Sequence, residues 1–474
     1  MMTHRRSRFF QSLVINLYGW TVAWTILIAN GMMAQEPNSA NNRKTSAVVN
    51  SDTDDQKPFR IAAIVTSYFP TSHAAHIVGK FIRGFPTDDG LIAPRTEIAS
   101  LFVDQVHEQD IGRQIAKKHD IPLYESIRAA LTLGTNQLAV DGVLLIAEHG
   151  DYARSTWGQE MLPRRYFMEQ ITGVIAKSGR PIPIYNDKHF SYRWDDAQWM
   201  YERTRELRVP LWAASAIPIV WRKPHSDCPA GAKVDRALVI GFHMLERYGF
   251  HALSVLQSQV ERRAGGETGV RSVQCLSGDD VWRAGKDGRW SLPLANAALR
   301  QIEDGPGELD PSQVKDPHVF LVDYDDGLQA AVLVLGDTGY VNKFAYAQQR
   351  GDTTDVWEYH VGPIEAAFGY LSLNIENFFL TGIPPSPVER TYLVTGILEA
   401  AMISNGRDGQ RVETAHLSTI EYQPSGHVVR PQATRPSGAS LDEWISLEPG
   451  ATPQAAPVPI TRDGTLGGSK KIVE

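Results

Sequence analysis

Carboxylate, imidazole and amide side chains follow three short apolar runs of the sequence. They are His73 and His76 after the run 61–65, Glu148, His149 and Asp151 after 143–147, and Asn186, Asp187 and His189 after 182–185. Carboxylates and imidazoles that converge can bind a divalent metal or carry out acid/base chemistry. A polar rim that is solvated and paired with itself is the structural alternative, and the sequence leaves both open.

These side chains meet only if the runs before them are strands of one parallel sheet. Between residues 60 and 216, apolar runs alternate with helical patterns, which predicts a doubly wound parallel sheet. Such sheets carry their site at the carboxyl ends of the strands. The predicted strands are 61–65, 99–103, 143–147, 182–185 and 211–214, and the predicted helices are 76–83, 109–118, 126–133, 165–177 and 195–207.

The loop after the first predicted strand contains no glycine. A dinucleotide-binding unit turns here through G-x-G-x-x-G, whose glycines let the backbone approach the pyrophosphate. This chain instead reads Thr66-Ser67-Tyr68-Phe69-Pro70-Thr71-Ser72-His73. Thr71 and Ser72 can cap the next helix, and the free N–H groups at its start can still bind an anion.

The pattern changes near residue 221. Strands now follow one another, and Asp325-Asp326-Gly327 is typical of a hairpin turn. Helices are set apart from these strands, which predicts an α+β domain with a mainly antiparallel sheet. The predicted strands are 319–324, 328–335, 341–346, 356–361 and 413–422, and the predicted helices are 250–262, 366–379 and 388–404.

The two ends of the chain differ from its middle. Arg5, Arg6 and Arg8 precede an apolar stretch from Leu13 to Ala29, which is typical of a secretory signal, although an uncleaved membrane anchor stays open. We therefore expect an exported protein, periplasmic or secreted. The predicted organisation is a signal peptide (1–34), a disordered linker (35–58), a Rossmann-like domain (59–220), an α+β domain (221–423) and a disordered tail (424–474).

Composition limits the classes of partner. A net charge of −7 with scattered basic residues disfavours nucleic acid or an anionic membrane surface as the main partner. Hydrophobic residues make up 42% and charged residues 21% of the chain, as in a globular protein. Cys228 and Cys275 could pair after export or stay free thiols, and no spacing resembles a zinc site.

Several segments in this order resemble the glucose–fructose oxidoreductase and inositol dehydrogenase family. The resemblance covers about residues 60 to 422. It rests on the segment 110–124, on Asp141-Gly142-Val143-Leu144-Leu145-Ile146-Ala147, on Ile184-Tyr185-Asn186-Asp187-Lys188-His189 where the family carries Glu-Lys-Pro, on Arg222 and Pro224, on Tyr248-Gly249-Phe250-His251 where it carries Asp-x-Gly-x-His, and on the segments from Asn377 to Gly409.

The resemblance implies an NAD- or NADP-dependent oxidoreductase acting on a carbohydrate or polyol. In that reading Lys188 orients the substrate, His251 is the general acid/base, and Asp104 binds a cofactor ribose. The implied cofactor-binding set is Thr71, Ser72, His73, Asp104, Glu148 and Asp187. Each also has an ordinary role: Lys188 paired with Asp187 or Asp151, His251 packed at a helix start, and Asp104 in a turn.

The chain also departs from the family pattern. The glycine fingerprint is absent, Arg247 stands at the signature's Asp position, and Glu-Lys-Pro has become Asp187-Lys188-His189. Two other functions therefore stay open. One is a non-catalytic sugar-binding or scaffold protein that has lost the cofactor, and the other is a metal-assisted enzyme using the Glu148, His149 and Asp187 edge. The C-terminal sheet is a candidate surface for forming a homo-oligomer.

Overall fold

The computed structural model describes residues 57–336 and 339–441. The predicted signal peptide, most of the predicted linker and the tail from residue 442 lie outside these described residues. Among the described helices, none has the length and apolar character needed to span a membrane.

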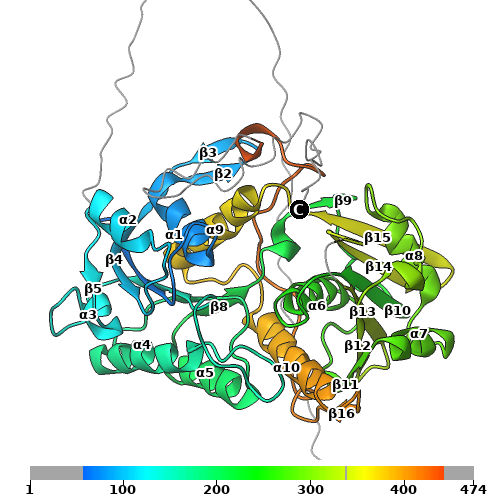
Figure 1. Ribbon diagram of the computed structural model, residues 1–474. Helices are drawn as coiled ribbons and strands as arrows, with labels where there is room; N and C mark the ends of the chain where they lie inside the picture. Colours follow the sequence, from blue (N-terminus) through cyan, green and yellow to red (C-terminus); the bar gives the residue numbers. More distant parts are fainter. Residues whose placement is uncertain (1–56, 337–338, 442–474) are drawn as a thin grey trace, which may run out of the picture. The chain divides into compact units, whose positions relative to one another are not determined.

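A six-stranded parallel sheet forms the N-terminal half, in the order β5-β4-β1-β6-β7-β8 (Figure 1). Its strands are β1 (Phe59–Val65), β4 (Thr96–Val103), β5 (Leu123–Tyr124), β6 (Gly142–Ile146), β7 (Ile184–Asp187) and β8 (Leu211–Ala214). β1 lies between β4 and β6 and is parallel to both. The apolar runs become strands because helices cover both faces and bury them, so the doubly wound Rossmann-like prediction is confirmed.

The helices of this half follow the predicted pattern. They are α1 (His73–Arg83), α2 (Gly112–Lys118), α3 (Ile127–Thr132), α4 (Arg164–Ser178) and α5 (Trp194–Glu206). In Figure 1, α3, α4 and α5 lie on one side of the sheet, and α1 lies on the other beside α9 (Ile364–Thr381), a helix from late in the chain. A small hairpin, β2 (Phe85–Thr87) and β3 (Gly90–Ile92), follows α1 and contacts α9.

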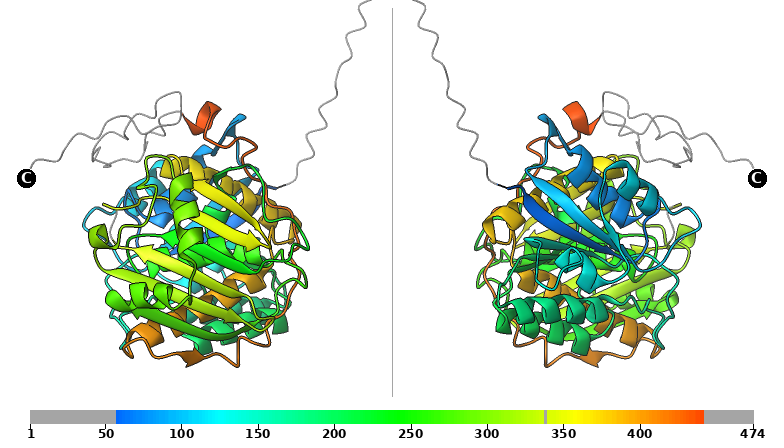
Figure 2. Two further views of the ribbon diagram at one scale, coloured as in Figure 1. Left: turned by 90° about the vertical axis from the view of Figure 1, so that its right-hand side faces the viewer. Right: turned by 90° about the vertical axis from the view of Figure 1, so that its left-hand side faces the viewer.

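The second half is built on an eight-stranded mixed sheet in the order β16-β11-β12-β13-β10-β14-β15-β9. Only β10 and β13 pair in parallel, so the predicted mainly antiparallel sheet is confirmed. The left view of Figure 2 shows this sheet face on. Its strands are β9 (Trp221–Lys223), β10 (Arg236–Gly241), β11 (Val270–Ser277), β12 (Pro317–Tyr324), β13 (Gln329–Leu335), β14 (Phe344–Arg350), β15 (Thr353–His360) and β16 (Val412–Glu413).

Four helices cover the mixed sheet. They are α6 (Arg247–Val260), α7 (Asp279–Lys286), α8 (Leu292–Gln301) and α10 (Val388–Asn405). Figure 1 shows α6 and α10 between the two sheets, with α7 and α8 on the outer side. Because α6 starts next to the parallel sheet, its first residues can reach the carboxyl ends of β7 and β8. Cys228 and Cys275 are buried free thiols, so the two cysteines do not pair.

Two expectations for the end of the chain need correction. The strand predicted at 413–422 is only β16, because the hydroxyls of Thr414 and Ser418 bond the carbonyl of Val270 at 2.7 and 3.3 Å and turn the chain. Residues 424–441, expected to be disordered, pack on the fold. For example, Asn374 exchanges two hydrogen bonds with the backbone of Val429.

Candidate functional site

Lys188 and Glu148 form a buried ion pair at the carboxyl edge of the parallel sheet. Lys188 directly follows β7 with a φ of +56°, a left-handed conformation that is uncommon for a residue other than glycine. Its Nζ donates to Glu148, which follows β6, and Arg164 Nη2 donates to the other carboxylate oxygen at 2.7 Å. Burial alone raises the pKa of Glu148, but Lys188, His73 and Arg164 hold it well below its usual range.

Asp187 and His73 form a second pair at the same edge. His73 Nδ1 lies 2.7 Å from Asp187 Oδ2, and Asp187 is almost completely buried. His73 is the first residue of α1, so this contact joins the ends of β1 and β7. The carboxylates of both Asp187 and Glu148 therefore bond protein groups, although the resemblance implies that they bind a cofactor.

His251 reaches this edge from the second turn of α6. Its Nδ1 lies 2.7 Å from the hydroxyl of Ser215, which follows β8. Burial, and then the nearby Lys188 and His73, lower the pKa of His251 well below its ordinary value. The structure therefore brings the two predicted catalytic residues, Lys188 and His251, into one cluster and keeps His251 neutral.

Two further imidazoles belong to this cluster. The half-buried ring of His149 lies 5.4 Å from that of His73, and burial, followed by His73, lowers its pKa to about 2. His189 is buried, and its pKa also falls well below the ordinary value because of burial and the nearby Arg164. His76, in contrast, is not part of the cluster, because its Nδ1 bonds Glu365 of α9 at 3.1 Å.

Arg247 occupies the position where the resembled family has an aspartate. It pairs with Glu160 and lies 4.0 Å from Glu148. Arg164, which pairs with Glu148, and Glu160, which pairs with Arg247, are charged members of this cluster that the sequence analysis did not name. Neither follows a strand, and no local pattern distinguishes them from other charged residues.

The loop after β1 is a tightly bonded turn. The hydroxyl of Ser72 accepts from the N–H groups of Phe69 and Ala75 at 3.1 and 3.2 Å, which confirms that Ser72 is the N-cap of α1. Thr71 beside it is exposed. Tyr68 is buried, and its Cβ would lie 2.9 Å from a Cβ added at Gly112, so the loop packs closely on α2.

The loops after β4 and β6 meet across the carboxyl end of β1. Asp151 N donates to Gln105 Oε1 at 2.7 Å, and Gln105 Nε2 donates to the carbonyl of Asp151 at 3.1 Å. Tyr152 donates its hydroxyl to Asp104 at 2.7 Å. Gly150 makes this approach possible, because a Cβ there would lie 2.3 Å from the Tyr152 ring.

Phe69, in the loop after β1, also contacts both of these loops. Its ring stacks on His107, after β4, with centroids 4.3 Å apart, and meets the edge of His149, after β6, at 5.2 Å. β1 and β6 are the strands between which the order of the sheet reverses. A ligand of a doubly wound sheet binds in the crevice at that reversal, and here protein groups occupy it.

The predicted metal edge is also internally paired. Glu148 bonds Lys188 and Arg164, and Asp187 bonds His73. Within residues 57–336 and 339–441, no group of three or more His, Cys, Asp and Glu side chains is placed to hold a metal ion.

No protein-family model matches this chain, and no curated protein matches its sequence. Solved structures do resemble its fold. GenD2 from gentamicin A biosynthesis, solved with NAD, shares 14% identity with a TM-score of 0.50 over 76% of this chain and 97% of that one. An oxidoreductase from Agrobacterium radiobacter, solved with NAD⁺, L-tartaric acid and magnesium, has 13% identity and a TM-score of 0.47 over 76% and 99%. Apo scyllo-inositol dehydrogenase from Lactobacillus casei has 9% identity and a TM-score of 0.47 over the same shares.

A nicotinamide dinucleotide does not fit the residues as they are placed. Its pyrophosphate would lie over the loop after β1, where Phe69 and the Gln105–Asp151 bridge stand. One oxygen of Asp104, the predicted ribose ligand, already accepts from Tyr152. The chain therefore has the two-domain fold of the glucose–fructose oxidoreductase and inositol dehydrogenase family. In this molecule, however, protein groups bridge the crevice in which a dinucleotide would bind.

Proposed function

We propose that this protein binds a carbohydrate or polyol at the carboxyl edge of its parallel sheet and does so without a nicotinamide dinucleotide. The observation that carries this proposal is the pair of hydrogen bonds between Gln105 and Asp151. They join the two loops between which a dinucleotide would have to lie. The chain would then keep a dehydrogenase fold as a binding scaffold.

The chemistry of the edge supports a hydroxyl-rich ligand. The pKa values of His149 and His251 lie far below neutral pH because of burial, so both rings are neutral. A neutral imidazole has one donor and one acceptor nitrogen, and a sugar hydroxyl likewise donates and accepts. The buried Lys188–Glu148 pair is surrounded by four half-buried side chains that a ligand could reach more easily: His73, His149, Arg247 and His251.

An NAD- or NADP-dependent oxidoreductase acting on a carbohydrate or polyol is the second candidate. It is favoured by the approach of Lys188 and His251 and by the fold shared with GenD2, which was solved with NAD. In that case Lys188 and His251 would hold and move the proton of a substrate hydroxyl. The closed crevice would then have to open by movement of Phe69 and the loop after β6.

Titration calorimetry with NAD⁺ and NADP⁺ separates the two candidates. We expect no binding by the wild-type protein at millimolar concentrations. A Phe69→Ala/Gln105→Ala variant tests whether the Phe69 ring and the Gln105–Asp151 bridge are what prevents dinucleotide binding, because it removes both from the crevice. Saturable binding of either dinucleotide by the wild-type protein would overturn the proposal and leave the oxidoreductase.

A panel of hexoses and inositols tests the ligand class in the same instrument. We expect at least one to bind, and His251→Gln to weaken that binding about tenfold, the effect of losing one good hydrogen bond to a buried ligand. Gln198→Ala is the matched control, because Gln198 bonds only Glu202 on the exposed face of α5. If every sugar and polyol fails to bind, or if both variants bind alike, the edge is not the site.

Two expectations from the sequence remain proposals. We propose that the protein is exported through its N-terminal segment, because a basic cluster followed by an apolar stretch precedes the folded part. N-terminal sequencing of the protein from the expected compartment would reveal a cleavage near residue 34. We also propose a homo-oligomer through the C-terminal sheet, which mass photometry of the full chain can test.

A further inference from the structure

A cavity of about 490 Å³ lies away from the sheet edge, beside the C-terminal end of α6. Its walls come from four places in the chain: the segment around β9, the end of α6, the start of α10 and the segment 424–432. The charged residues among its walls are Arg222, Asp227, Glu261, Arg262, Arg390 and Arg430, and His225 and His427 also line it. Four arginines thus face two carboxylates.

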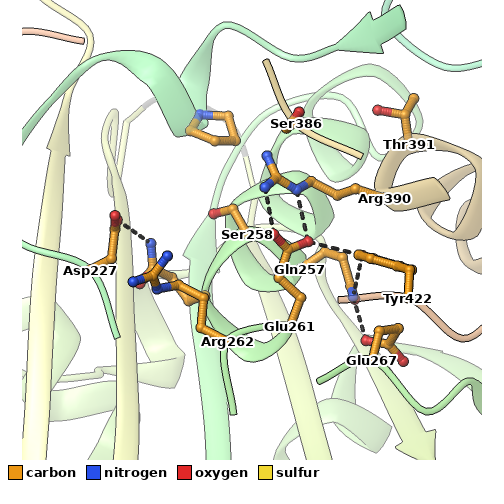
Figure 3. Close-up of polar contacts among 12 residues, drawn as sticks. Asp227, Gln257, Ser258, Glu261, Arg262, Glu267, Ser386, Arg390, Thr391 and Tyr422 are labelled. Atoms are coloured by element: carbon orange, nitrogen blue, oxygen red, sulfur yellow. Dashed lines mark hydrogen bonds and ion pairs between the residues drawn. The ribbon is translucent and has the colours of Figure 1, made fainter. Parts of the chain in front are cut away.

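The two carboxylates are already well supplied with donors. Figure 3 shows Arg390 and Tyr422 directed at Glu261. Arg390 donates through two nitrogens, with Nε at 2.8 Å, and the Tyr422 hydroxyl donates at 2.9 Å. The other carboxylate, Asp227, accepts from Arg222, from Arg430 Nη1 at 2.6 Å and from Gln259 Nε2 at 3.1 Å.

The arginines keep donors that these carboxylates do not use. A guanidinium has five N–H groups in a planar fork. Arg262 donates one N–H, from Nε, to the carbonyl of Cys228 at 2.7 Å, and Arg430 donates one N–H to Asp227. Arg222 is only 2% exposed and already donates to Asp227 and to the carbonyl of Pro218. The unused donors that a ligand in the cavity can reach are therefore those of the half-buried Arg262 and Arg430.

From these contacts we infer that the cavity binds an oxyanion, a sulfate, phosphate or carboxylate group carried by a small molecule. Arginine forks match such planar or tetrahedral groups and can donate to them in pairs. The volume falls within the range of small-molecule sites and exceeds that of one inorganic ion, so a sugar-sized carrier fits.

This site is separate from the one at the sheet edge. His251 lies in the second turn of α6, and Glu261 follows the last turn, ten residues later. That spacing corresponds to about 15 Å along a helix axis. The segment 424–432 forms one wall of the cavity. Its turn depends on Gly426, whose φ is +88° and where a Cβ would lie 2.4 Å from the carbonyl of Pro385.

Titration calorimetry of the full chain with five probes tests the inference. The probes are inorganic sulfate, inorganic phosphate, glucose 6-sulfate, glucose 6-phosphate and gluconate, with glucose as the neutral control. We expect at least one anionic probe to bind and to be displaced by rising chloride, because arginine contacts to an oxyanion are screened by salt. The order of affinities among the probes identifies the group and its carrier.

Variants locate that binding. Arg262→Gln and Arg430→Gln each remove one guanidinium from a half-buried position, and each should weaken the probe about tenfold. Arg283→Gln is the matched control, because Arg283 is an exposed arginine of α7 paired only with Asp280. Circular dichroism confirms folding of each variant. Failure of all five probes, or equal binding by the cavity variants and the control, would overturn the inference.

Discussion

Gln105 and Asp151 exchange two hydrogen bonds across the carboxyl end of β1, at 2.7 and 3.1 Å. Gln105 follows β4 and Asp151 follows β6, and these two strands flank β1 in the sheet. In an open doubly wound sheet, a ligand separates these loops. Here they are bonded to each other, and this bridge distinguishes the molecule from a dinucleotide-binding member of its fold.

Removing the bridge should cost little stability. Gln105→Ala deletes both hydrogen bonds at a partly exposed position, so we expect the free energy of unfolding to fall by about 1 kcal/mol. Denaturant unfolding measures this change. Gln198→Ala, an exposed residue with one side-chain hydrogen bond, should stay within about 0.5 kcal/mol of the wild type. A loss of several kcal/mol in Gln105→Ala would show that the bridge supports the whole sheet rather than the loops alone.

Glu148 should be much more important for stability. Glu148→Gln leaves Lys188 and Arg164 buried without an anionic partner, and we expect the free energy of unfolding to fall by about 3–5 kcal/mol. Adding Lys188→Met should recover part of the loss, because it removes one of the stranded charges. Denaturant unfolding of the single and double variants tests both statements. If Glu148→Gln lowered the free energy of unfolding by less than about 1 kcal/mol, water would have to solvate the charges of Lys188 and Arg164, which would contradict their burial.

The buried imidazoles should make the protein sensitive to acid. Burial, then His73, lowers the pKa of His149 to about 2, and burial, then Arg164, lowers that of His189 well below its ordinary value of 6.5. As the pH falls below about 6.5, the unfolded chain takes up protons that the folded chain does not, so stability decreases. The depressed pKa of Glu148 adds a loss only below about 4.5, its value in the unfolded chain.

Melting curves from about pH 7.5 to about pH 5 test this dependence, because the imidazoles dominate in that window. We expect the melting temperature to fall as the pH is lowered, and to fall less in His149→Gln, which has no ring to protonate. A melting temperature that does not change over this window would contradict the lowered pKa values.

Two helical glycines should respond to alanine in opposite directions. A Cβ at Gly369 of α9 would lie 2.3 Å from the backbone carbonyl of Pro86, so Gly369→Ala must push β2 away from the helix. We expect it to cost about 1–3 kcal/mol. Gly173 of α4 is exposed with no atom within 4 Å of such a Cβ, so Gly173→Ala should stabilise the protein by about 0.5–1 kcal/mol. Thermal unfolding of both variants measures the difference, and destabilisation by Gly173→Ala would contradict the packing described here.

Strong local patterns made most of the fold predictable. The run 61–65 became β1 and the run 211–214 became β8, because continuous apolar residues in short segments must be buried on both sides. The prediction was poorer where side chains replace the ladder. Thr414 and Ser418 bond the backbone of Val270, so the β-prone segment 413–422 turns instead of extending.

The sequence by itself determined which residues stand at the carboxyl edge. Glu148, Asp187 and Lys188 lie at or just after the end of a strand and His251 lies near the start of a helix, and strand order brings such positions together. The missing glycines also indicated a changed crevice. Only the tertiary structure decided how those groups are paired, for example that Glu148 meets Arg164 and that Gln105 reaches Asp151. Contacts of this kind depend on side-chain geometry between segments distant in the chain, and no local period or spacing encodes that geometry.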